Sequence, residues 1–281
     1  MSNHINALHQ GDCADILPTL APASIDLAYL DPPFMTNRRL KGAARSNHPA
    51  VDFNDRWPTL EHYLTFLRQR ITHIHRVLTP DGSILVHCDW RTSHHVRLIL
   101  DDVFGHERFV NHLIWWYGLG GSSPRRFARK HDDILFYARS ENYYFDPPRV
   151  PSTSRRMQGK PKKATDVLAI PSINNQARES TGYPTQKPLA LLELLISACA
   201  PPESIVLDPF CGSGTTLVAA RNLKRRYIGI DTNPDAIRIA KQRLNHSSKR
   251  TIPETQGAAK RPGSATSVAE VPSTPTTIAK P

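Results

Sequence analysis

The residues best suited to chemistry in this 281-residue sequence are a carboxylate, two prolines and an aromatic ring in succession, Asp31, Pro32, Pro33 and Phe34. They follow the apolar run IDLAYL, which is typical of a strand. The prolines fix the backbone and leave its carbonyls free to accept hydrogen bonds. A carboxylate and a carbonyl can accept both hydrogens of an exocyclic amino group while Phe34 stacks on the planar ring that bears it. On its own, Asp-Pro-Pro is most often a strand-to-loop turn.

A second motif, VLDPFCGSGTT at 206–216, places a strand, a glycine turn and a helix start in succession. Gly212 and Gly214 lack the side chains that would keep a ligand away from the backbone. Asp231 ends the next apolar run, 17 residues after Gly214, at a spacing where a carboxylate can bind both hydroxyls of a ribose. This pattern predicts a nucleoside ligand, and the alternative is a glycine turn needed only for packing.

Asp208, just before the glycines, narrows the choice of nucleoside. A carboxylate at this place would repel a pyrophosphate, but it can bind the ammonium of an amino-acid group. The loop also lacks the Gly-Lys-Ser/Thr of a phosphate-binding loop. Both features favour S-adenosylmethionine (SAM) over NAD or ATP as the cofactor.

Short apolar runs that end at Gly, Asp or Pro alternate with helical patterns along the chain, at 24–34, 82–89, 109–118, 131–139, 204–210 and 226–231. Leucine and isoleucine recur at steps of three and four from Leu60 to Leu78, which predicts a helix ended by Pro80 and Gly82. Asn233 and Pro234 are typical of a helix start. The alternation predicts an α/β fold with a largely parallel sheet.

DPPF, then TQKP at 185–188, then DPFCGSGTT occur in the order found in the amino-group DNA methyltransferases, N6-adenine/N4-cytosine methylases of the permuted (beta) class. The chain resembles this family over roughly residues 9–245. The resemblance implies a Rossmann-like SAM-dependent methyltransferase fold. Its sheet has seven strands, mostly parallel with one reversed strand, and the motif order is circularly permuted.

The resemblance also implies roles for residues of both motifs. Asp12 would bind the SAM adenine amino group with Cys13 beside it, Thr185 and Lys187 would lie near the SAM carboxylate, and Asp231 would bind the ribose. The residues expected to line the methionine part are Asp208, Phe210, Gly212 and Gly214. Asp31 is assigned to both the catalytic and the cofactor site, and Pro32, Pro33 and Phe34 to the target base.

The charge of +11 is concentrated in three polar segments, with net +7 in 121–163, +3 in 35–58 and +3 in 247–281. The rest of the chain is close to neutral, which suits a nucleic-acid footprint. We predict a mobile loop at 35–58, a small target-recognition insert at about 146–181 within a methyltransferase domain of residues 1–246, and a disordered tail at 247–281. The residues predicted to bind double-stranded DNA are Arg38, Arg39, Trp115, Arg125, Arg126, Arg129, Lys130, Arg155 and Arg156.

Several classes of protein are disfavoured by what the sequence lacks. No apolar stretch reaches the length of a membrane span and the N-terminus does not resemble a signal peptide, so we expect a cytoplasmic protein without a membrane partner. The spacing of the thirteen histidines does not fit a metal site, and we predict none. The four cysteines are widely separated, which is typical of reduced thiols.

Together these features predict a site-specific DNA methyltransferase that modifies the N6 of a flipped-out adenine. Aspartate at position 31 favours adenine, because the resembling N4-cytosine enzymes more often carry serine there. N4-cytosine methylation is the first alternative. A non-catalytic nucleic-acid-binding protein on the same scaffold is the second, and methylation of RNA or a protein side chain is a weaker third. The resemblance also allows a homodimer and a cognate restriction endonuclease as partners.

Overall fold

The computed structural model describes residues 4–42, 51–118, 122–152, 154–174 and 177–247. The chain divides into two units, residues 1–248 and 249–281. The predicted tail lies outside the described residues from 248 onward. In the described part of the chain, none of the helices has the length and apolar character that a membrane span requires.

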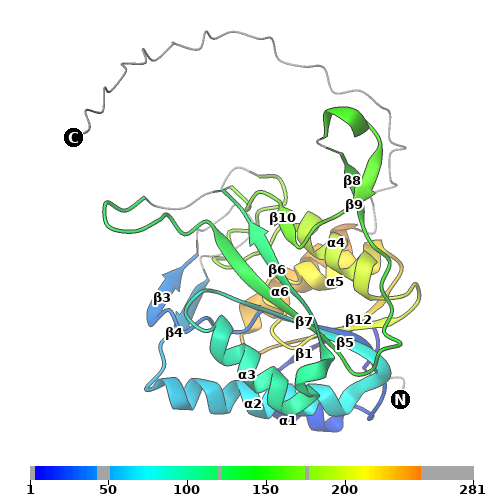
Figure 1. The fold of residues 1–281 in the computed structure, drawn as a ribbon. Helices are drawn as coiled ribbons and strands as arrows, with labels where there is room; N and C mark the ends of the chain where they lie inside the picture. The colour runs from blue at the N-terminus through cyan, green and yellow to red at the C-terminus, as the bar shows by residue number, and fades with distance from the viewer. Residues whose placement is uncertain (1–3, 43–50, 119–121, 153, 175–176, 248–281) are drawn as a thin grey trace, which may run out of the picture. The chain divides into compact units, whose positions relative to one another are not determined.

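The described part is built on one eight-stranded sheet (Figure 1). In spatial order its strands are β1 (Ala7–Gln10), β12 (Arg226–Asp231), β11 (Ile205–Asp208), β2 (Ile25–Leu30), β5 (Leu78–Cys88), β7 (His131–Ala138), β6 (Phe109–Trp116) and β10 (Val167–Ala169). All neighbouring pairs are parallel except the two that β7 makes, with β5 and β6. The predicted α/β fold, mostly parallel with one reversed strand, is therefore confirmed.

The eighth strand, β10, adds one strand to the seven predicted. It pairs in parallel with β6 over three residues, Val167 to Ala169. Leu168 is buried in the core, and the Trp115 indole N–H donates to the Ile170 carbonyl at 2.8 Å. Part of the segment predicted as a recognition insert thus completes the edge of the sheet, because it supplies apolar surface that β6 would otherwise expose.

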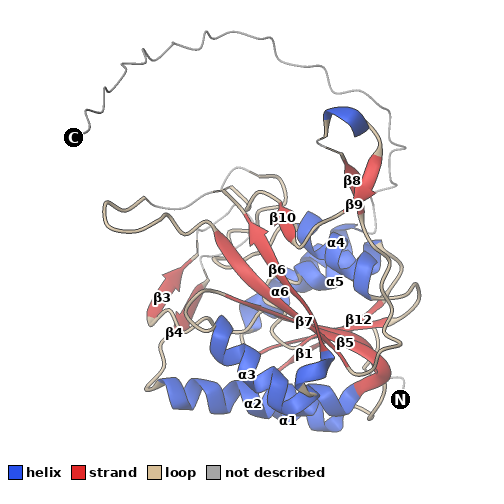
Figure 2. Cartoon of the chain, viewed as in Figure 1, coloured by secondary structure: helices blue, strands red, loops and turns tan. Residues whose placement is uncertain are grey.

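Helices cover both faces of the sheet (Figure 2). They are α1 (Cys13–Ile16), α2 (Leu60–Val77), α3 (Ser93–Phe104), α4 (Leu189–Cys199), α5 (Thr215–Asn222) and α6 (Pro234–Ser247), with 3-10 turns at Leu17–Thr19, His106–Arg108 and Arg155–Met157. The first three pack on one face and α4 and α5 on the other, with α6 against α5. Strand β2 shows why two faces are needed, since Ala28 and Leu30 enter one apolar cluster while Leu27 and Tyr29 enter the other.

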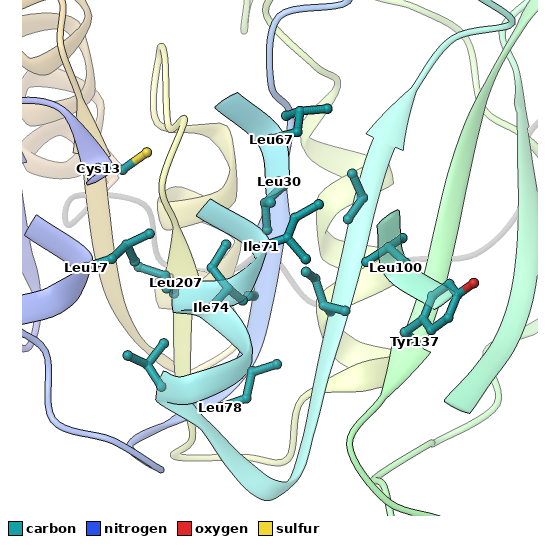
Figure 3. Close-up of a cluster of buried hydrophobic side chains, with 14 of the residues drawn as sticks. Cys13, Leu17, Leu30, Leu67, Ile71, Ile74, Leu78, Leu100, Tyr137 and Leu207 are labelled. Atoms are coloured by element: carbon teal, nitrogen blue, oxygen red, sulfur yellow. The ribbon is translucent and has the colours of Figure 1, made fainter. Parts of the chain in front are cut away.

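Helix α2 follows the predicted apolar stripe. Thr59 caps its start by accepting the His62 N–H, and Leu67, Ile71 and Ile74 are fully buried against the sheet (Figure 3). Leu78, the last residue of the stripe, already belongs to β5. Tyr63 adds an aromatic ring to the same buried face and points its hydroxyl toward residues 31–34.

Two antiparallel hairpins lie outside the sheet. Strands β3 (Arg38–Lys41) and β4 (Asp52–Asp55) pair within the segment predicted as an irregular loop, and residues 43–50 between them are not described. Strands β8 (Arg149–Pro151) and β9 (Pro161–Lys163) pair within the predicted recognition insert. Because the apolar periodicity of both segments is weak, backbone pairing rather than core burial defines these elements.

Candidate active site

Three aspartates meet at one edge of the sheet. Asp231 ends β12, Asp208 ends the neighbouring β11, and Asp31 directly follows β2. These three strands are adjacent and parallel, so their carboxyl ends open on the same side. A cavity of about 280 Å³ lies there. Such a crevice at the carboxyl ends of parallel strands is where ligands bind in open α/β folds.

The cavity collects every predicted catalytic and cofactor residue except Gly214. These lining residues are Asp12, Cys13, Asp31, Pro32, Pro33, Phe34, Thr185, Lys187, Asp208, Phe210, Gly212 and Asp231. They come from five separate stretches of sequence, 12–13, 31–34, 185–187, 208–212 and 231. The fold therefore brings the three motifs into one site.

Gly214 has a packing role in addition to its predicted cofactor contact, which stays a prediction. It is the N-cap of α5, with φ of +76°, and a Cβ there would lie 2.7 Å from the Cβ of Ala240 on α6. A side chain would therefore be strained and would push the two helices apart. Gly212, by contrast, faces the cavity, and its N–H donates to Asp231 at 2.8 Å.

Asp31 is paired with Lys187. The Lys187 ammonium donates to Asp31 Oδ2 at 2.5 Å, and both side chains are nearly buried, with 11% and 15% exposed. The same ammonium lies 5.2 Å from the centre of the Phe34 ring. The sequence placed Lys187 in the cofactor site, and the structure places it against the predicted catalytic acid and ring.

A buried histidine supports Phe34. His87 on β5 is fully buried, and its ring stacks on Phe34 with centroids 5.6 Å apart. One ring nitrogen is 2.8 Å from the Tyr29 hydroxyl and the other is 3.2 Å from Asp132. Burial would raise the pKa of Asp132, but the hydrogen bond and charge of His87 hold it below its usual value. His87 went unpredicted because its strand carries no motif.

The turn at residues 31–34 is held from two further elements. The Tyr63 hydroxyl on α2 donates to the Pro33 carbonyl at 2.7 Å. Asp55, buried at the end of β4, accepts the N–H groups of Met35 and Thr36 and the Thr36 hydroxyl. The base of the 35–58 segment is thus held at the site. The β3–β4 pairing corrects the expectation of irregular backbone, and the mobility of the segment stays a prediction.

The carboxylates of Asp208, in the glycine motif, and of Asp231, at the end of β12, are strongly desolvated. Asp208 is 2% exposed, and burial raises its pKa to about 7, although the Thr216 hydroxyl and the Phe210 N–H stabilise the charge. Burial also raises the pKa of Asp231, whose two oxygens accept the N–H groups of Gly212 and Asn233. Both groups would gain from a cationic or hydroxyl-bearing ligand.

Asp12 already has a strong partner. It caps α1 by accepting the Ala14 N–H, and the buried Arg70 guanidinium lies 2.6 and 2.7 Å from its two oxygens. Burial would raise the pKa of Asp12, but the Ala14 N–H and Arg70 hold it below its usual value. Its predicted contact with adenine would therefore add to an existing ion pair.

The predicted DNA-binding residues fall into three groups. Arg38, Arg39, Arg125, Arg126, Arg129, Arg155 and Arg156 are exposed, whereas Lys130 is half-buried. Arg38, Arg126 and Arg129 line a second cavity of about 350 Å³, where the Arg129 guanidinium stacks 3.3 Å above the exposed Trp90 ring. The prediction that Trp115 binds DNA is wrong, because this side chain is only 4% exposed and packs in the core. Its neighbour Trp116 is 49% exposed.

Metal and thiol chemistry have little support in the described residues. No group of three metal-binding side chains gathers in this part of the chain. The absence of a metal stays a prediction. All four cysteines are buried and free, and burial raises the pKa of Cys88 and Cys211 well above the usual range, which disfavours a thiolate nucleophile.

The raised pKa of Asp208 predicts a pH dependence of stability. As the pH rises, the unfolded chain loses this proton first, near its ordinary pKa of 3.8, and the folded chain only near about 7. The stabilising contribution of protonated Asp208 is therefore complete below the lower value and lost as the pH rises through the upper one. We therefore compare the free energy of unfolding of Asp208→Asn with that of the unsubstituted protein. We expect the difference, in favour of the variant, to grow by up to about 1.4 kcal/mol for each pH unit between these two values.

Urea unfolding at a series of pH values measures this difference. Asp15→Asn, which removes an exposed carboxylate, is measured in the same way as the matched control. Parallel curves for Asp208→Asn would show that Asp208 ionises at an ordinary pKa in the folded chain.

Comparison with known proteins identifies the family. A DNA methylase family model matches residues 25–242. The type II methyltransferase M.BglII of Bacillus subtilis is 30% identical over 268 residues, which cover 86% of this chain and 69% of that protein. M.HpaI of Haemophilus parainfluenzae is 32% identical over 234 residues, which cover 82% of this chain and 71% of that protein.

Solved structures share the fold. The complex of M1.HpyAVI with SAM has a TM-score of 0.60 and 24% identity, covering 85% of this chain and 98% of that one. The PvuII DNA methyltransferase, described as cytosine-N4-specific, has a TM-score of 0.62 and 16% identity, covering 86% and 89%. Since the family model spans most of the chain and a relative at least 30% identical aligns over more than two thirds of it, the protein belongs to the N6-adenine/N4-cytosine DNA methylase family.

Proposed function

We propose that the protein transfers the methyl group of SAM to the exocyclic N6 of an adenine flipped out of double-stranded DNA. The observation that carries this proposal is the meeting of Asp31, Asp208 and Asp231 in one cavity together with the turn at residues 31–34. A pocket for a cationic nucleoside and a receptor for a planar amino-bearing base thus share one space.

The lining residues fit SAM. Asp208 is buried and its pKa is raised by desolvation, so its ionised form gains from a cation. Asp231 is positioned by two backbone N–H groups at the end of β12, where a ribose would lie. When bound, SAM supplies a methyl group on a positively charged sulfur. Its ammonium and sulfonium complement a cavity in which the charged lining residues, among those that the structure describes, are five aspartates and one lysine.

The target base would be held by the turn at residues 31–34. Asp31 accepts one hydrogen of the amino group, the Pro32 carbonyl accepts the other, and Phe34 stacks on the ring. Tyr63 engages the Pro33 carbonyl and so fixes the turn without occupying that of Pro32. The amino nitrogen is itself the nucleophile, and the protein contributes orientation and electrostatics rather than a covalent intermediate.

The choice of adenine rests on the aspartate at position 31. Family membership covers both N6-adenine and N4-cytosine enzymes. The fold is similar to that of the PvuII DNA methyltransferase, which is described as cytosine-N4-specific. Methylation of cytosine N4 is therefore the second candidate function. The non-catalytic alternative is disfavoured because a binding module needs neither the carboxylate at 31 nor a cofactor cavity.

Double-stranded DNA is the proposed partner. Arg38 of the β3–β4 hairpin and Arg126 and Arg129 of the 122–130 segment line the second cavity, next to the β6 and β7 strands. Their charge suits phosphate contacts, which position a duplex without reading its sequence. A cytoplasmic location, a homodimer and a cognate endonuclease stay predictions.

The function is tested by incubating the protein with SAM carrying a labelled methyl group and duplex DNA, RNA or protein. Mass spectrometry of the nucleosides from the DNA should reveal N6-methyladenine. N4-methylcytosine would overturn the adenine assignment. Label confined to RNA or protein would overturn the DNA assignment, and no transfer to any substrate would favour the non-catalytic alternative.

Variants of two aspartates separate chemistry from cofactor binding. Asp31→Ala removes an acceptor of the target amino group, so we expect methyl transfer at saturating SAM to fall by about 100-fold or more without a loss of SAM affinity. Asp231→Ala removes the ribose acceptor, so SAM affinity by calorimetry should fall about tenfold or more. Substantial turnover by the first variant, or unchanged affinity in the second, would contradict the corresponding role.

A further inference from the structure

We propose that Lys187 is a positioning residue that moves between two carboxylates, Asp31 and the carboxylate of SAM. The Lys187 ammonium lies in the proposed target-base site, and the SAM carboxylate draws it away and frees Asp31. The inference rests on the proposed function, because it assumes that Asp31 receives the target base and that SAM enters the same cavity.

Lys187 lies where the target amino group should be. Its ammonium donates to Asp31 Oδ2 at 2.5 Å and lies 5.2 Å from the centre of the Phe34 ring. These are the two contacts proposed for the base, a hydrogen bond to the carboxylate and the face of the ring. The ammonium and a base amino group are both donors, so a base placed there would compete with Lys187 for the same carboxylate oxygen and the same ring face.

Lys187 is also the cation that a ligand carboxylate would meet. Among the described residues that line the cavity it is the single lysine or arginine, whereas the aspartates are Asp12, Asp31, Asp55, Asp208 and Asp231. The Arg70 guanidinium nearby is committed to Asp12. One ammonium must therefore serve both Asp31 and any carboxylate brought by the cofactor.

The exchange is favourable only when the second carboxylate is present. The Lys187 side chain is 11% exposed, and a desolvated ammonium that leaves one carboxylate without reaching another loses its charge-assisted hydrogen bond. Exchange between two carboxylates keeps that bond, and the flexible four-carbon stem of lysine permits the movement. A cofactor with a carboxylate thus frees Asp31, and one without it does not.

Binding of two ligands measures the exchange without catalysis. The first is S-adenosylhomocysteine, and the second is its analogue with hydrogen in place of the carboxylate. Calorimetry gives the dissociation constant of each ligand. We call the value for the analogue divided by the value for S-adenosylhomocysteine the carboxylate preference, and it reports how strongly Lys187 holds the ligand carboxylate. In the unsubstituted protein this preference is reduced by competition from Asp31.

Asp31→Asn keeps the shape of the side chain and removes the competing charge. We expect the carboxylate preference to rise by about tenfold, because Lys187 no longer leaves an ion pair to bind the ligand. Lys187→Met should reduce the preference to about 1, and Lys187→Arg should retain it because the positive charge is kept. Lys241→Met, an exposed control on α6, should leave the preference unchanged.

An unchanged preference in Asp31→Asn would overturn the exchange, as would a preference retained in Lys187→Met. Failure of S-adenosylhomocysteine to bind the unsubstituted protein would overturn it as well, together with the proposed cofactor site. If the preferences change as expected but labelled SAM methylates no DNA, the exchange stands and the proposed function fails. If DNA is methylated and the preferences do not change, the proposed function stands and the exchange fails.

Discussion

The site depends on the cost of gathering carboxylates at one edge of a parallel sheet. Strand ends bring Asp31, Asp208 and Asp231 into one desolvated cavity. Desolvation and mutual repulsion disfavour the charged carboxylates there, and a different interaction offsets this at each of the three residues. Asp231 accepts two backbone N–H groups, Asp31 takes the Lys187 ammonium, and burial raises the pKa of Asp208 to about 7. A cavity with five aspartates and one lysine is suited to a cationic nucleoside, which lowers the electrostatic cost of gathering the carboxylates.

The second requirement is a rigid turn after β2. Tyr63 holds the Pro33 carbonyl from one helix, and Asp55 holds the following backbone N–H groups from the β3–β4 hairpin. His87 stacks on Phe34 from the central strand β5 and is itself fixed by Asp132. Contacts from three elements thus place one ring and one carboxylate, which is the preorganisation that direct transfer between two bound molecules requires.

The sequence predicted the parts of the site whose chemistry is local. Strand, glycine turn and terminal acid are close in sequence, so the spacing pointed to the glycine motif and Asp231 as candidate cofactor residues. The cofactor candidates outside this stretch followed only from the family resemblance. Contacts between residues far apart in the sequence could not be predicted in this way. The Lys187 and Asp31 pair joins residues 156 positions apart, and Gly214 is required by its approach to Ala240 on another helix. Trp115 was misassigned because an aromatic residue beside glycines and arginines can face the core as readily as the surface, and burial is decided by the pairing of β6.

The central claim is that one cavity holds the cofactor beside the acid that receives the target base. A crystal structure with S-adenosylhomocysteine tests it most directly. The ribose hydroxyls should lie within hydrogen-bond distance of Asp231, with the sulfur facing the Asp31 side of the cavity and the Lys187 ammonium on the ligand carboxylate. A ligand bound elsewhere, or one whose sulfur points away from residues 31–34, would contradict the account.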